Sequence, residues 1–115
     1  MVAYSYEFTA WWNELTEEQQ DDVAHSVGLL EEVGPALGFP HSSKIMGSRH
    51  GAMRERTQSS GRPLRTLYIF DPRRTAILLI GGDKTGNDRW YEEFVTFADR
   101  VYDQHLEELR KEGRL

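Results

Sequence analysis

The sequence predicts a small α+β domain in which a strand, a helix, a meander of strands and a long helix follow one another. Residues 64–70 and 75–80 are rich in β-branched and aromatic side chains and flank a proline-containing turn, which is typical of an antiparallel hairpin. Residues 15–30 and 87–109 carry apolar side chains at helical spacing. No βαβ repeat is present, so the helices are expected to pack on a small antiparallel sheet.

The N-terminal part of the chain predicts a strand and then a helix. Val2, Tyr4, Tyr6 and Phe8 alternate with smaller or polar residues, which predicts a half-buried strand over residues 2–8. Thr16 and Gln19 have the spacing of a capping box and predict where the first helix begins. Gly34 and Pro35 end that helix.

The middle of the chain predicts loops and strands. Glycine, proline and serine are frequent over residues 34–52, which predicts a loop. Residues 52–58 predict a third strand, and residues 59–63 a turn. The glycine-rich segment 81–86 is expected to end the sheet, with glycines that adopt positive φ. It lacks the spacing and the βαβ setting of a nucleotide-binding P-loop.

Length and composition favour one domain without a membrane span. We assign residues 1–110 to a single domain and 111–115 to a polar tail, within 115 residues in all. No apolar run approaches the roughly 18 residues that a membrane helix needs. The N-terminus lacks the pattern of a signal peptide, and the absence of cysteine excludes disulfides and thiolate metal sites. The four histidines show no ligand spacing, so we expect no metal or cofactor. From the missing signal-peptide pattern and the absence of cysteine we expect a cytoplasmic protein.

The charge of the chain reverses at residue 44. Residues 1–43 contain eight acidic residues and no lysine or arginine, whereas residues 44–74 contain eight basic and two acidic residues. Such a cationic middle in a chain of net charge −5 indicates an anion-binding surface. The alternative is that acidic helices neutralise a basic sheet within the same domain.

Arginines in two predicted strands are candidates for phosphate binding. Arg54 and Arg56 are two residues apart, so both are expected on one face of the sheet. Together with Arg65 on the neighbouring strand they would form a cradle for a scissile phosphate, because guanidinium groups present forked donors that stay charged. Arg73 and Arg74 lie in a turn, where solvated charge is the alternative explanation.

The chain resembles the RelE/HigB superfamily of bacterial toxins. The resemblance runs from about residue 4 to 110 and is strongest over residues 65–86, where the sequence Phe-Asp-Pro-Arg-Arg precedes a leucine-rich strand, a glycine pair and a lysine. It implies a microbial RNase fold, a small twisted antiparallel sheet backed by helices. It also implies metal-independent cleavage of mRNA on the ribosome by attack of the 2′-hydroxyl, and neutralisation by a cognate antitoxin, expected to be a helix-turn-helix protein.

The resemblance assigns roles to residues of this sequence. Arg65 matches a phosphate-clamping arginine, and Lys84 matches a basic residue at the end of the last strand. Trp90 or Tyr91 would stack on an RNA base, or else dock the last helix on the sheet. The catalytic candidates are Arg65, Arg54, Arg56 and Lys84, and the RNA-binding candidates are Lys44, Arg49, Arg73, Arg74, Trp90 and Tyr91.

The chain departs from the family pattern in the third strand. Related sequences read basic–Glu–Leu–Arg where this one reads Arg54-Glu55-Arg56, as if a leucine were missing. A missing strand residue would turn one arginine away from the cleft. Two other functions stay open at this point: a ParE-like inhibitor of DNA gyrase, and a decayed toxin that only binds its antitoxin. A basic antitoxin segment would suit the acidic surface of the first helix around Asp21 and Glu31.

Overall fold

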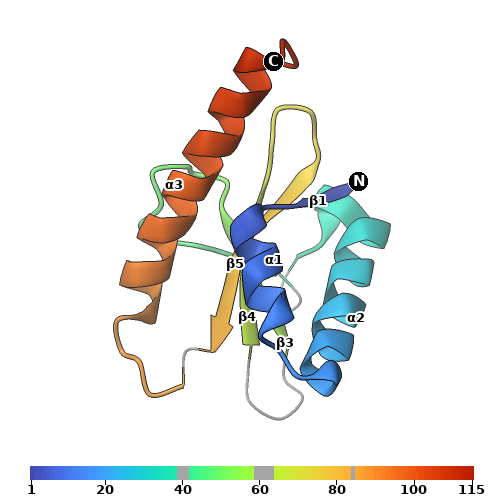
Figure 1. Cartoon of the computed structure of the whole chain (residues 1–115), viewed down its shortest axis with the longest axis vertical. Helices are drawn as coiled ribbons and strands as arrows, with labels where there is room; N and C mark the ends of the chain where they lie inside the picture. Colours follow the sequence, from blue (N-terminus) through green and yellow to red (C-terminus); the bar gives the residue numbers. More distant parts are fainter. Residues whose placement is uncertain (39–41, 59–63, 84) are drawn as a thin grey trace.

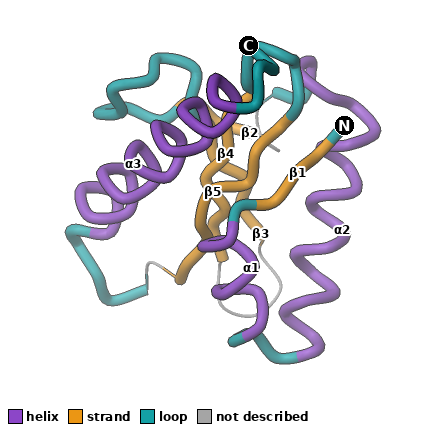
Figure 2. Tube along the Cα trace, turned by 45° about the horizontal axis from the view of Figure 1, so that its top comes forward, coloured by secondary structure: helices purple, strands orange, loops and turns teal. Residues whose placement is uncertain are grey.

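A five-stranded sheet lies between one long helix and a pair of shorter helices (Figures 1 and 2). The computed structural model describes residues 1–38, 42–58, 64–83 and 85–115. The strands are ordered β1-β5-β4-β3-β2, with β1 parallel to β5 and every other pair antiparallel. Their bounds are Val2–Tyr4 for β1, Ser42–Lys44 for β2, Arg54–Gln58 for β3, Leu64–Phe70 for β4 and Ala76–Asp83 for β5. The predicted α+β class is confirmed.

Each face of the sheet has its own apolar core. The helices α1 (Tyr6–Asn13) and α2 (Glu17–Val33) cover one face, which we call the α2 face; Phe8, Val23 and Leu30 are buried there. Helix α3 (Trp90–Lys111) covers the other, the α3 face. No helix in the described ranges is both long and apolar enough to cross a membrane.

The predicted strand over residues 2–8 is wrong beyond Tyr4, because a helix begins at Tyr6. Ser5 is the cause: its hydroxyl accepts a hydrogen bond from the backbone N–H of Phe8 at 2.9 Å and donates one to the carbonyl of Leu79 at 2.8 Å. An N-cap therefore outweighs the alternating pattern. Since β1 runs parallel to β5, the sheet is mixed rather than wholly antiparallel.

The capping box that predicts the start of α2 is confirmed. The Thr16 hydroxyl accepts from the backbone of Gln19, whose side chain accepts from the backbone of Thr16. The helix ends at Val33, and Gly34 follows with φ of +69°. The predicted loop over residues 34–52 is wrong in part, because it contains the short edge strand β2.

The predicted strands over residues 52–58, 64–70 and 75–80 and the antiparallel hairpin are confirmed, with the last strand extended to Asp83. The predicted turn over residues 59–63 lies outside the described residues. The long C-terminal helix is also confirmed, although it begins at Trp90 rather than at residue 87. Phe97, expected on its apolar stripe, is 37% exposed.

Gly81 and Gly82 lie within β5, so the expectation that they adopt positive φ is wrong; Gly86 does adopt it, with φ of +75°. Both strand glycines instead allow an aromatic ring to lie close to the backbone of β5. A Cβ atom on Gly81 would lie 2.3 Å from the ring of Trp11, and one on Gly82 would lie 2.8 Å from the ring of Phe94. The glycine pair thus lets helices pack tightly on both faces of the strand.

Candidate functional site

The register between β3 and β4 divides the predicted basic cluster between the two faces of the sheet. Arg54 and Arg56 share the α2 face, as predicted. Arg54 donates to the hydroxyl of Ser42 at 2.8 Å, and Arg56 donates to the carbonyl of Ser26 in α2 at 3.3 Å. Arg56 is only 5% exposed, and burial lowers the pKa of its guanidinium. These contacts join Ser42 of β2 and Ser26 of α2 to β3.

The predicted cradle of Arg54, Arg56 and Arg65 is not formed, because Arg65 lies on the opposite face. Its Nη1 lies 3.3 Å from Oε1 of Glu55, which precedes Arg56 and so points to the α3 face. Successive residues of a strand cannot share a face without a bulge. The pairing of β3 with β4 runs without a bulge from Arg54 opposite Tyr68 to Gln58 opposite Leu64.

The apparent missing leucine is therefore not a gap in the sheet. Arg56 follows Glu55 directly and is buried beneath α2. Thr57 comes next and pairs with Arg65 in the ladder. The ladder between β3 and β4 is therefore continuous through Arg56 and Thr57.

Glu55, Arg65 and Tyr91 form a polar cluster, which we call the Glu55 site. The Tyr91 hydroxyl lies 3.0 and 2.9 Å from the two carboxylate oxygens of Glu55 and donates to the carboxylate. Burial, the hydrogen bond and the charge of Glu55 raise the pKa of Tyr91 to about 12, so the phenol keeps its proton near neutral pH. Glu55 is 8% exposed and the Arg65 side chain is half-buried, so the site opens to solvent at one side.

The first turn of α3 is held on the sheet next to the Glu55 site. Trp90 is 1% exposed and stacks on Phe94 with ring centroids 4.6 Å apart. Gly82, opposite Arg65 in the ladder, leaves room for both rings. Trp90 therefore docks the helix and does not present its ring to an RNA base, whereas Tyr91 next to it reaches Glu55.

The other predicted basic residues are not gathered at the Glu55 site. Arg73 and Arg74 follow the far end of β4 from Arg65, and Arg73 donates to the buried carboxylate of Asp71 at 2.7 Å. Arg74 is exposed, with φ of +65°. Lys44 is exposed at the end of the edge strand β2. Lys84 lies outside the described residues.

The loop before β3 is held on α3 by carboxylates. Arg49 pairs with Asp103 and donates its backbone N–H to Asp99 at 3.1 Å, and Nε2 of His50 lies 2.8 Å from Asp103. The hydrogen bond from His50 is the main cause that lowers the pKa of Asp103, and Arg49 adds to it. Arg49 and His50 thus fix the loop, although the Arg49 side chain stays largely exposed.

Asp71 fixes the hairpin turn between β4 and β5. Burial opposes its ionisation, but hydrogen bonds from His105, Arg73 and the backbone of Thr75 outweigh burial and lower the pKa of Asp71. His105 is half-buried at this carboxylate. The turn and the middle of α3 are thereby joined.

The Glu55 site combines a proton acceptor, a phosphate-binding cation and a proton donor, the groups that phosphoryl transfer to a hydroxyl nucleophile uses. A carboxylate can accept a proton, a guanidinium can bind a phosphate through two donors, and a protonated phenol can donate. Glu55 and the pairing of Tyr91 with it are not part of the prediction from sequence. The available signal was the alternation of β3, which puts Glu55 on the face opposite to Arg54 and Arg56.

Comparison with known proteins places the chain in a family. Residues 10–103, which include the whole Glu55 site, match the family described as "Phage derived protein Gp49-like (DUF891)". Two relatives are from Mycobacterium tuberculosis. "Putative toxin HigB2" is 44% identical over 85% of this chain and 50% of its own length. "Putative toxin HigB3" is 41% identical over 78% of this chain and 79% of its own length. The chain thus spans about half the length of HigB2. The chain belongs to the Gp49-like family and is a homologue of HigB toxins.

Proposed function

We propose that this protein is the toxin of a type II toxin–antitoxin pair and acts as a ribosome-dependent mRNA endonuclease that inhibits translation. The single observation that carries the proposal is the Glu55 site, in which one carboxylate contacts both Arg65 and Tyr91. Family membership supports it, because the relatives are named as toxins. Such an enzyme would act in the cytoplasm on message held by the ribosome.

The proposed reaction needs no group beyond the side chains of the site and the RNA. Glu55 takes the proton of the 2′-hydroxyl, whose oxygen forms a bond to the adjacent phosphorus as the bond to the 5′-oxygen breaks. Arg65 turns from Glu55 to the phosphate and neutralises the charge that develops there. Tyr91 gives its proton to the leaving 5′-oxygen and regains one from Glu55. The products are a 2′,3′-cyclic phosphate and a free 5′-hydroxyl.

The remaining basic residues fit a secondary role in this proposal. Lys44 and Arg74 are exposed, and the Arg49 side chain is largely exposed, so all of them can contact RNA phosphates without a change in the fold. Lys84 lies outside the described residues, and the phosphate contact expected for it from the sequence stays a prediction. Arg54, Arg56 and Arg73 have structural contacts instead.

The proposal is tested by mapping message ends in a translating extract. Purified protein is added, and new 5′ ends are located by primer extension. Wild-type protein is expected to produce cleavages that Arg65→Ala lacks, while Arg110→Ala, which removes an exposed arginine at the far end of α3, cleaves as wild type does. Absence of cleavage by the wild type would contradict the proposal and favour a gyrase inhibitor, tested by supercoiling, or a toxin that only binds its antitoxin.

A further inference from the structure

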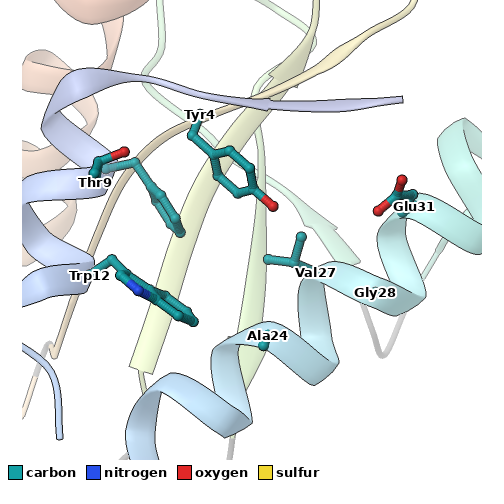
Figure 3. Close-up of a pocket in the computed structure, with 8 residues that line it drawn as sticks. Tyr4, Thr9, Trp12, Ala24, Val27, Gly28 and Glu31 are labelled. Carbon is teal, nitrogen blue, oxygen red and sulfur yellow. The ribbon is translucent and has the colours of Figure 1, made fainter. Parts of the chain in front are cut away.

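An apolar groove runs between α1 and α2, on the side of the molecule away from α3 (Figure 3). Its volume is about 280 Å³. The lining residues come from β1, α1 and α2: Tyr4, Phe8, Thr9, Trp12, Ala24, Val27, Gly28 and Glu31. Tyr4 stacks on Phe8 with ring centroids 5.7 Å apart and is nevertheless 58% exposed, so an aromatic face at the rim is open to a partner.

Gly28 is not explained by the packing of the chain itself. It lies in the middle of α2, where glycine is unfavourable relative to alanine. A Cβ atom at this position would meet nothing within 4 Å, and φ there is not in the left-handed region. The fold therefore has no need of glycine at residue 28. What the missing side chain does is keep the groove open beside Ala24 and Val27.

The charge of the segment that forms the groove indicates the chemistry of the occupant. The eight carboxylates within residues 1–38 are accompanied by no lysine or arginine in that segment. None of the eight forms an ion pair with another described residue. The acidic helices thus do not neutralise the basic strands within the described fold. Glu31 lines the groove itself, so a cation next to an apolar side chain would be bound favourably.

We propose that the α1–α2 groove is the docking site for a basic amphipathic segment of the antitoxin. An apolar side chain of that segment fills the space beside Gly28 and Val27, and a lysine or arginine pairs with Glu31. The proposal rests on the proposed function, because that function supplies the partner. The groove lies by the α2 face, whereas Glu55 lies on the α3 face. A segment bound in the groove therefore holds the toxin without contacting the Glu55 site.

The test uses the purified product of the reading frame next to this gene as the probe and calorimetry as the readout. Gly28→Leu fills the groove and is expected to weaken binding by roughly thirtyfold or more, because a central apolar contact is lost. Glu31→Lys is expected to weaken binding roughly tenfold. Gly28→Ala and Glu32→Lys are the matched controls. Glu32→Lys makes the same charge change as Glu31→Lys on an exposed residue outside the groove. Both controls should bind within about threefold of wild type.

Several outcomes would overturn the proposal. Binding of Gly28→Leu and Glu31→Lys at wild-type strength, with thermal unfolding showing that both are folded, would contradict it, as would no binding of the wild type. A wild-type dimer that Gly28→Leu dissociates would assign the groove to a second copy of the chain. Cleavage in the translating extract separates the two proposals. Gly28→Leu is expected to cleave message as wild type does and to keep cleaving when the antitoxin is present. If the wild type does not cleave message, the proposed function is contradicted, but the binding result is unchanged.

Discussion

Nη1 of Arg65 lies 3.3 Å from Oε1 of Glu55 on the neighbouring strand, so a guanidinium and a carboxylate face each other at the edge of α3. Both side chains are largely buried but keep some exposure to solvent. In the proposed function, Arg65 leaves this carboxylate to bind the phosphate of the RNA.

The arginine at residue 65 should not be replaceable by lysine. Arg65→Lys keeps the charge but loses the forked donors that bind a phosphate through two hydrogen bonds. We expect cleavage by Arg65→Lys to fall by roughly a hundredfold, the scale of losing one stabilising donor. The rate of message cleavage in the extract measures this. Near wild-type cleavage by the lysine variant would show that charge alone is needed there.

The Tyr91 hydroxyl should make stability sensitive to alkaline pH. The pKa of Tyr91 is raised to about 12, whereas an unfolded tyrosine loses its proton near pH ~10. Because the neutral phenol is favoured in the folded state, its stabilising contribution is complete below the unfolded pKa and is lost as pH rises toward the folded pKa. Urea unfolding across this range should show a steeper loss for wild type than for Tyr91→Phe. Parallel curves would contradict the assignment.

Arg56 should be replaceable by leucine without loss of stability. The Arg56 guanidinium is buried beneath α2 and donates to the Ser26 carbonyl, which is already within a helix. Apolar residues of similar volume often match or exceed a buried charged group in stability. We therefore expect the free energy of unfolding of Arg56→Leu to equal or exceed that of wild type.

Arg56→Ala is the comparison for that variant. It should lose about 2 kcal/mol or more, because a cavity is left under the helix. Thermal and urea unfolding measure both variants. A leucine variant as unstable as the alanine variant would show that the hydrogen bond, and not the volume of the side chain, holds α2 in place.

Alanine substitution should change the free energy of unfolding in opposite directions at Gly81 and Gly28. A Cβ atom on Gly81 would lie 2.3 Å from the Trp11 ring, so Gly81→Ala must displace that ring, α1 or the strand. We expect it to destabilise the fold by about 1–3 kcal/mol. Gly28→Ala, with open space around the new atom, should stabilise α2 by up to about 1 kcal/mol. Unfolding in urea compares the two, and similar effects at both positions would contradict the packing described for β5.

The sequence predicts the parts of the fold that have strong local signals. The capping box at Thr16, the hairpin over β4 and β5 and the stripe of α3 are local patterns, and the structure confirms them. The short strand β2 and the parallel pairing of β1 depend on distant partners, which no local pattern reveals. At Ser5, the signal for a helix start competes with the alternation that favours a strand, and the helix is formed.

The site was predictable only in part. Arg65 and Tyr91 are among the residues that the sequence singles out, and they meet at Glu55. The cradle with Arg54 and Arg56 was wrong because it assumed that arginines of adjacent strands share a face. Face is fixed by the register between β3 and β4, which pairs Thr57 with Arg65. That register depends on the whole ladder, and the arginine spacing within one strand does not reveal it.

The most direct test of the Glu55 site is the single substitution Glu55→Gln, measured by primer extension of message from a translating extract together with cosedimentation of the protein with ribosomes. Glutamine keeps the shape and accepts a hydrogen bond from Tyr91 but does not act as a base near neutral pH. We predict that Glu55→Gln sediments with ribosomes as wild type does and that its cleavage falls by roughly a hundredfold or more. Cleavage at the wild-type rate by a folded Glu55→Gln protein would contradict the central claim that this carboxylate is the base.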